Sequence, residues 1–394
     1  MGVSIIGTGH TEVGRLEDDI YGLIEEAGRE ALEEAEIDPG DIGGIWLANF
    51  SAGSFNSQEH LAPYALNIDE KLRFTPATRV ENACASGSAA IAEARRAIEA
   101  GEIDFALVIG VEKMTSCDTS ETMKILSKAS YWPQEGSEGM TFPGLFAEFA
   151  RGYSEQHDIA LDELREDFAR IAAKNHRNAT ENPLAQMPWD CSYEDILSLS
   201  EDKNPVIAEP LHMYDCSLIS DGAAAAVLTS AEKAEGEDRA VEIVACSHVT
   251  DHLSLDRRVN YEFTAGQKAV KSALTETGLA VSDLDFAEIH DCFTIAELLS
   301  YETLGIVGDG EGSRAIREGL TEPEGKLPIN PSGGLKAKGH PVGATGVSMA
   351  VLCARQLRGD PLGVDIDGAE IGASYNIGGS AASNYFLIYK LQNG

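Results

Sequence analysis

The sequence predicts an α/β fold with two similar halves, on three observations. Short apolar stretches alternate with stretches of helical period. The run 105–110 has no polar alternation, which is typical of a strand buried on both faces of a parallel sheet. A spaced apolar pattern that begins at Ala31 recurs from Ala273, a constant offset of 242 residues. Such a repeat indicates an internal duplication of a whole α/β unit; the alternative is a chance similarity of two amphipathic helices.

The first half alternates strand and helix. We predict strands over 3–6, 45–48 and 105–110, and helices over 18–35 and 84–99. The first helix is amphipathic, with these residues on one face: Ile20, Leu23, Ile24, Ala27, Ala31 and Leu32.

The residue composition of the chain changes from about residue 116. Aromatic residues, prolines and methionines appear, followed by helical stretches at 145–153 and 161–178 without clear strands. This region is interpreted as a mainly helical insertion, and the α/β pattern resumes near 215–230. The predicted division is 1–115 with 211–245 as the first half, 116–210 as the insertion and 246–394 as the second half.

The second half repeats the plan, with a strand over 286–289 and a helix over 347–357. A glycine turn at 374–380 lies between two apolar runs, which is typical of a hairpin connection. Duplicated sheets are expected to pack through their helices, so that equivalent strand ends surround one shared cleft.

The chain of 394 residues is strongly acidic, with 65 Asp and Glu against 30 Lys and Arg and a formal net charge of −35. This charge argues against nonspecific nucleic-acid binding, and its even distribution suggests adaptation to high salt. The apolar runs are too short to cross a membrane, and no signal-peptide pattern begins the chain. The seven cysteines lack disulfide or zinc-site spacing, so we predict a cytoplasmic protein without a metal.

Cys84 lies between small residues at the start of the second predicted helix. The helix macrodipole and the free N–H groups of the first turn favour a thiolate there, which makes Cys84 a candidate nucleophile. The alternative from the local sequence is a buried structural cysteine.

Two other segments bear reactive side chains. His290 and Cys292 follow the strand 286–289, where α/β folds place their sites. His340 precedes a glycine-rich helix start, where an imidazole is able to accept a thiol proton. Its surroundings lack the spacing of a phosphate-binding loop. With the amides of the turn at Gly378, these groups supply what acyl transfer through a thioester needs.

These motifs resemble known signatures. The runs 82–87 (NACASG), 339–346 (GHPVGATG) and 376–379 (NIGG) resemble three signatures of the thiolase family. The runs 290–293 (HDCF), 174–179 (KNHRNA) and 214–217 (YDCS) look like those of sterol-carrier-protein-type and archaeal thiolases. The resemblance covers essentially the whole chain. It implies a duplicated five-layer αβαβα fold with an inserted loop domain, assembled as a homodimer or tetramer.

The resemblance also implies roles. Cys84 would bear the acyl group, His340 would activate it, and His290 would polarise the second thioester. The amides of Cys84 and Gly378 would bind the oxyanion, and Asn376 in the same turn is a further candidate for this role. Many thiolases have a cysteine at the position of Asn376, and that cysteine removes the α-proton of the second acetyl-CoA. An asparagine side chain is not a base. In the subgroup with the HDCF motif the cysteine of that motif takes this role, so the resemblance points to Cys292 as the base. Ser217, Lys174 and Arg177 are candidate substrate-binding residues, the last two for CoA phosphates unless they form a solvated helix face.

The implied function is reversible condensation of two acetyl-CoA to acetoacetyl-CoA and CoA, without a tightly bound cofactor. Alternatives are a thiolase for longer 3-ketoacyl-CoA, a decarboxylating condensing enzyme and a non-catalytic lipid-carrier or scaffold relative. The resemblance to archaeal thiolases suggests a complex with hydroxymethylglutaryl-CoA synthase and a small scaffold protein in isoprenoid synthesis.

Overall fold

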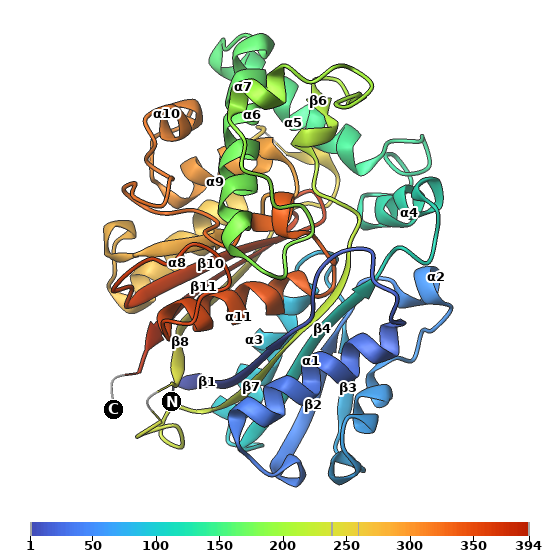
Figure 1. Cartoon of the computed structure of the whole chain (residues 1–394), viewed down its shortest axis with the longest axis vertical. Helices are drawn as coiled ribbons and strands as arrows, with labels where there is room; N and C mark the ends of the chain where they lie inside the picture. The colour runs from blue at the N-terminus through green and yellow to red at the C-terminus, as the bar shows by residue number, and fades with distance from the viewer. Residues whose placement is uncertain (1, 238, 259, 393–394) are drawn as a thin grey trace.

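The computed structural model describes residues 2–237, 239–258 and 260–392. Its centre is a nine-stranded mixed sheet with the order β3-β2-β4-β7-β1-β8-β11-β10-β9 (Figure 1). The strands are β1 Val3–His10, β2 Ile42–Ala48, β3 Ala77–Val80, β4 Phe105–Lys113, β7 Asp221–Ser230, β8 Val241–Thr250, β9 Phe286–Ile289, β10 Ile371–Gly378 and β11 Ser383–Leu391. A separate small sheet pairs β5 (Val206–Ala208) with β6 (Leu211–His212).

The sheet consists of two parts joined at a narrow seam. Within the described part of the chain, β1 and β8 pair only through Ser4 with Glu242 and Ile5 with Val241. In one part, the parallel strands β3, β2 and β4 are followed by antiparallel β7 and β1. In the other, β8, β11 and β10 are antiparallel and β9 is parallel to β10. The predicted α/β fold is therefore confirmed.

Helices cover both outer faces and fill the space between the two parts (Figure 1). α1 packs on β1, β7 and β4, and α8 packs on β8 and β11. Between the parts, α3 contacts β2 and β4, while α11 contacts α3, β7 and β10. The helices are α1 Ile20–Ala35, α2 Ala52–Asn56, α3 Ser86–Glu99, α4 Thr119–Leu126, α5 Phe142–His157, α6 Leu161–Asn178, α7 Tyr193–Leu197, α8 Thr264–Thr277, α9 Thr294–Leu304, α10 Gly312–Arg317 and α11 Thr345–Leu357.

The first helix shows why the predicted stretches fold as they do. Asp19 caps α1 by accepting hydrogen bonds from the backbone N–H groups of Tyr21 and Gly22. The helix ends at Glu36, which adopts the left-handed conformation with φ of 52°. The predicted apolar face is buried against the sheet.

α3 and α11 touch each other through glycines near their first turns. A Cβ added at Gly87 would lie 2.5 Å from the backbone N of Val347. One added at Gly346 would lie 2.2 Å from the backbone N of Ser88. Only glycine permits this approach, which brings the N-terminal ends of the two helices together.

Residues 116–210 contain α4 to α7; α5 and α6 pack on α9 of the second part, whereas α4 contacts α2 of the first part (Figure 1). The Phe146 ring of α5 stacks on Phe293 at 4.5 Å between centroids, and α6 contacts α9. The domain boundaries inferred from the sequence stay a prediction. Among the described residues, no helix combines the length and the apolar character that crossing a bilayer requires.

Candidate active site

Cys84 lies in a tight turn between β3 and α3. Ala83 adopts a left-handed conformation with φ of 51°. Ser86 Oγ donates to the carbonyl oxygen of Ala83 at 2.6 Å and accepts from the Asn82 N–H at 2.8 Å. These bonds fix the turn that presents the Cys84 side chain, which is 6% exposed.

His290 follows β9, and the pairing of β9 with β10 decides its neighbour. The two strands run parallel with Ile289 opposite Tyr375, so His290 and Asn376 come next to each other. Asn376 Nδ2 lies 3.0 Å from His290 Nδ1. Both side chains are buried.

His340 is held by contacts on both sides. Its backbone N–H donates to Ser220 Oγ at 2.9 Å, and its Nδ1 lies 2.7 Å from Thr345 Oγ1. The Thr345 hydroxyl donates to the carbonyl oxygen of Pro341 at 3.0 Å, so its lone pairs are free to accept. We therefore assign the His340 proton to Nδ1, which leaves Nε2 as a proton acceptor.

The fold brings these three side chains together. Cys84 Sγ and one ring nitrogen each of His290 and His340 all lie within 4.8 Å of one another. The two imidazole rings are 5.0 Å apart and nearly perpendicular, at 87°. Residues from three distant segments thus form one cluster of a thiol and two imidazoles.

Burial controls the protonation of the cluster. It raises the pKa of Cys84 to about 12, although the backbone N–H groups of Gly379 and of Cys84 itself act in the opposite direction. Burial also lowers the pKa of His340 to about 3. Desolvation therefore opposes the thiolate that the helix N-terminus favours at Cys84. The resting pair is a neutral thiol and a neutral imidazole.

Cys84, His340 and Cys292 line one pocket of about 460 Å³ together with Ser217. Burial raises the pKa of Cys292 well above its usual range, and the nearby Cys84 acts in the same direction. Most of the remaining lining is apolar: Phe50, Met114, Met123, Leu126, Ala129, Phe142, Pro143, Ile207, Met213, Leu218, Ile219, Phe293 and Val342. A thioester is suited to such a pocket, because it exposes one carbonyl and is otherwise apolar near the reacting carbon.

The glycine turn after β10 lies against Cys84. A Cβ at Gly378 would meet the carbonyl oxygen of Asn82 at 2.5 Å, so the turn needs a residue without a side chain. The N–H that acts on the thiol belongs to the next residue, Gly379. The oxyanion role of Gly378 stays a prediction, and Gly379 is a donor that the sequence reasoning missed.

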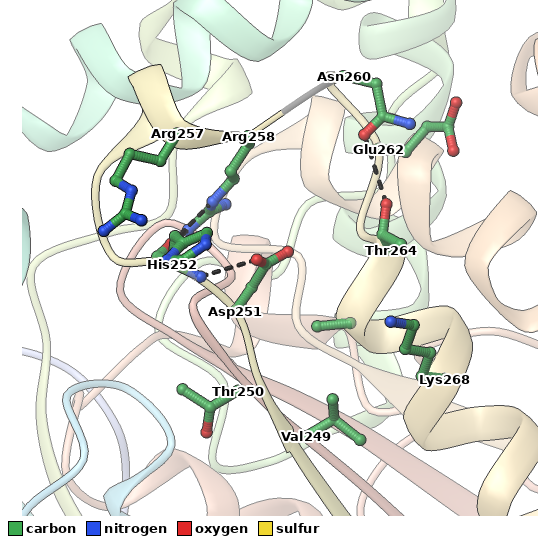
Figure 2. A pocket seen from close by; sticks show the side chains of 11 residues that line it. Val249, Thr250, Asp251, His252, Arg257, Arg258, Asn260, Glu262, Thr264 and Lys268 are labelled. Carbon is green, nitrogen blue, oxygen red and sulfur yellow. Dashed lines mark hydrogen bonds between the residues drawn. The ribbon is translucent and has the colours of Figure 1, made fainter.

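A separate hollow of about 380 Å³ is lined by residues from the end of β8, from the loop that follows it and from the start of α8 (Figure 2). Arg258 lies in this loop and donates to the carbonyl oxygens of His252 and Ser380. None of the predicted site residues lines the hollow. The bond to Ser380 connects this loop to the turn that contains Gly378.

The prediction for Lys174 needs correction. Its side chain is fully buried, and Nζ lies 2.6 Å from Glu297 Oε1 and 2.9 Å from the carbonyl oxygen of Ile329. It is neither on a solvated helix face nor free to bind a CoA phosphate. Arg177 is half-buried and pairs with Glu322 at 3.0 Å, so its role in substrate binding stays a prediction.

The sequence reasoning also missed the supports of the His290 segment. Asp291 accepts hydrogen bonds from the backbone N–H groups of Leu335 (2.6 Å) and Lys336 (3.0 Å) and from Asn175 Nδ2 (2.8 Å). This carboxyl group thereby ties the segment with His290 to the segment that precedes His340. The sequence did contain a signal for this role, because the acidic residue Asp291 lies between the candidate catalytic residues His290 and Cys292.

Comparisons with known proteins agree with this geometry. The family model of the thiolase N-terminal domain matches residues 3–232, and the thiolase C-terminal domain-like model matches 247–391. An acetyl-CoA acetyltransferase of Methanothermobacter thermautotrophicus is 39% identical over 97% of each chain. Sterol carrier protein 2 of Bos taurus is 31% identical over 95% of this chain and 70% of its own length.

The solved structure of human mitochondrial 3-ketoacyl-CoA thiolase in complex with CoA has the same fold. It superposes with a TM-score of 0.73 at 17% identity, covering 100% of this chain and 98% of its own. The predicted thiolase-type fold and the resemblance to archaeal and sterol-carrier-type members are confirmed. The chain belongs to the thiolase family.

Proposed function

We propose that this protein is an acetyl-CoA acetyltransferase, which converts two acetyl-CoA to acetoacetyl-CoA and CoA and catalyses the reverse reaction. The observation on which this proposal rests is the cluster of Cys84, His290 and His340 beside an apolar pocket. The 39% identity to an acetyl-CoA acetyltransferase supports the same activity and does not favour the longer-chain or non-catalytic alternatives.

In the first half-reaction, Cys84 Sγ attacks the thioester carbon while its proton passes to His340 Nε2. The oxyanion accepts hydrogen bonds from the N–H of Cys84 and from the Gly378–Gly379 turn. The bond from carbon to the CoA sulfur then breaks, the sulfur takes the proton from His340, and acetyl-Cys84 remains.

In the second half-reaction, Cys292 as a thiolate removes the α-proton of a second acetyl-CoA. The raised pKa of Cys292 means that few molecules have the thiolate at a given moment. It also makes that thiolate a stronger base, which suits the removal of a proton from a weakly acidic C–H bond. His290 donates a hydrogen bond to the thioester oxygen. The carbanion attacks acetyl-Cys84, the Cys84 thiolate leaves, and it recovers its proton from Cys292.

Mass spectrometry of the intact protein after incubation with acetyl-CoA tests this function. We expect one acetyl group on Cys84 and none in the Cys84→Ala variant, together with formation of acetoacetyl-CoA by the wild type. An unmodified Cys84, or acetylation without any condensation product, would contradict the proposal.

The finer expectations are part of the proposal as well. The protein is proposed to be a cytoplasmic homodimer or tetramer that operates at high salt, and to supply isoprenoid synthesis through hydroxymethylglutaryl-CoA synthase and a small scaffold protein. The charge of −35 supports operation at high salt, and the other points rest on the resemblance to archaeal thiolases. Light scattering and affinity purification test them; a monomer that retains no partner would count against them.

A further inference from the structure

The side-chain amide of Asn376 is completely buried and makes three hydrogen bonds. Its Nδ2 lies 3.2 Å from the carbonyl oxygen of Cys84 and 3.0 Å from Nδ1 of His290. Its Oδ1 accepts from Ser88 Oγ at 2.8 Å. The amide therefore connects the nucleophile, one imidazole and helix α3.

The chemistry of these neighbours determines the orientation of the amide. A backbone carbonyl accepts hydrogen bonds and never donates, so the Asn376 atom that faces Cys84 has to be the nitrogen. The oxygen then faces Ser88, whose hydroxyl is a donor. Both N–H bonds of the amide are used, one for Cys84 and one for His290.

This orientation determines the tautomer of His290. Because Asn376 donates to Nδ1, that nitrogen offers its lone pair, and a neutral imidazole then has its proton on Nε2. The ring is neutral because burial and the neighbouring His340 keep the pKa of His290 well below its usual range. Among the described residues, Nε2 has no hydrogen-bond partner although it is buried. Such an N–H gains a bond only when a ligand oxygen arrives.

The two histidines thus adopt opposite tautomers. His340 has its proton on Nδ1, facing Thr345, and presents a bare nitrogen to the thiol. We propose that Asn376, oriented by Ser88, is a positioning residue that keeps His290 as an N–H donor to the thioester oxygen of the second acetyl-CoA. This inference rests on the proposed acetyltransferase function. It gives a role to Asn376, which occupies the position of the cysteine base in many thiolases.

Asn376→Asp tests the inference, because it replaces the donor nitrogen with an acceptor oxygen of nearly the same size. His290 must then put a proton on Nδ1, and we expect condensation to fall about 10²- to 10³-fold, as for loss of one oxyanion donor. Ser88→Ala removes only the bond that orients Oδ1, so we expect a smaller loss in the same direction. Asn67→Asp, an exposed position, is the control for the added charge.

The decisive readout is the tautomer itself, measured by nitrogen NMR on histidine-labelled protein with His290→Gln for assignment. We expect the proton on Nε2 in the wild type and on Nδ1 in Asn376→Asp. A wild-type proton on Nδ1, or an unchanged tautomer in a folded Asn376→Asp protein, overturns the inference. The wild-type spectrum decides the question even if that variant does not fold. If the protein gives the expected spectrum but forms no acetoacetyl-CoA, the control of the His290 tautomer by Asn376 is supported, whereas the proposed acetyltransferase function is contradicted.

Discussion

Lys174 and Glu297 form an ion pair at 2.6 Å, and both side chains are fully buried. Glu297 also accepts hydrogen bonds from Tyr301, Asn175 and Asn330. The pair therefore belongs to a buried network that joins α6 of the insertion to α9 behind the catalytic strand end.

Lys174→Met should destabilise the protein rather than weaken CoA binding. Removing one partner leaves the Glu297 charge buried without its cation, which costs about 3–5 kcal/mol of unfolding free energy. Lys71→Met is the matched control, since Lys71 pairs with Asp38 on the surface, where solvent screens the pair and its loss should change stability little. Urea denaturation measures both. If both variants lose equally little stability and Lys174→Met has a raised KM for acetyl-CoA, the structural role of Lys174 is contradicted.

Gly346→Ala should disturb both stability and activity. The new Cβ would overlap the backbone of α3 at Ser88 and push the helix start near His340 away from Cys84. Overpacking of this kind costs about 1–3 kcal/mol. In Gly22→Ala the new Cβ of α1 has ordinary contacts, so that variant should be as stable as the wild type or up to about 1 kcal/mol more stable. If the two variants unfold at the same temperature, the close contact between α3 and α11 is wrong.

Alkylation of Cys84 by iodoacetamide should become faster with pH over the whole accessible range. The reagent reacts with the thiolate, and a pKa raised to about 12 keeps the thiolate fraction proportional to hydroxide concentration far above neutrality. We expect about a tenfold increase in rate per pH unit between pH 6 and 9. Peptide mass spectrometry gives the rate at Cys84 alone. A plateau near pH 7 would indicate a thiolate–imidazolium pair instead.

Salt should stabilise the protein, because it screens repulsion among the acidic side chains. Glu26 illustrates the effect: burial, Asp18 and Glu30 all raise its pKa. A carboxyl group with a raised folded-state pKa destabilises the fold at pH values above that pKa. Glu26→Gln should therefore raise the melting temperature slightly at pH 7 in dilute buffer, and less in strong salt. A melting temperature that does not depend on potassium chloride concentration would refute the interpretation of the charge.

Periodicity and glycine placement were sufficient to predict much of this fold. The strand 286–289 and the helix 161–178 agree with β9 and α6 at both ends. The helix α9 was missed because every residue from Thr294 to Leu304 is buried, so the sequence shows no amphipathic stripe.

The site was predictable to the extent that reactive residue types stand out along the chain. Cys84, His290, Cys292 and His340 do so, whereas Ser88 and Asn376 are ordinary polar residues until β10 and α3 bring them together. Lys174 was misjudged because a lysine in an amphipathic helix is usually exposed, and its partner lies 123 positions away.

The most direct test of the proposed mechanism separates its two half-reactions in Cys292→Ser, with Cys216→Ser as the control at another cysteine of the same pocket. Rapid-quench mass spectrometry measures acetylation of Cys84, and a coupled assay measures acetoacetyl-CoA. We predict acetylation within a few-fold of the wild type and condensation lowered about 10²- to 10⁴-fold in Cys292→Ser, as for loss of a general base. Both steps should persist in Cys216→Ser. Near wild-type condensation in Cys292→Ser would contradict the account.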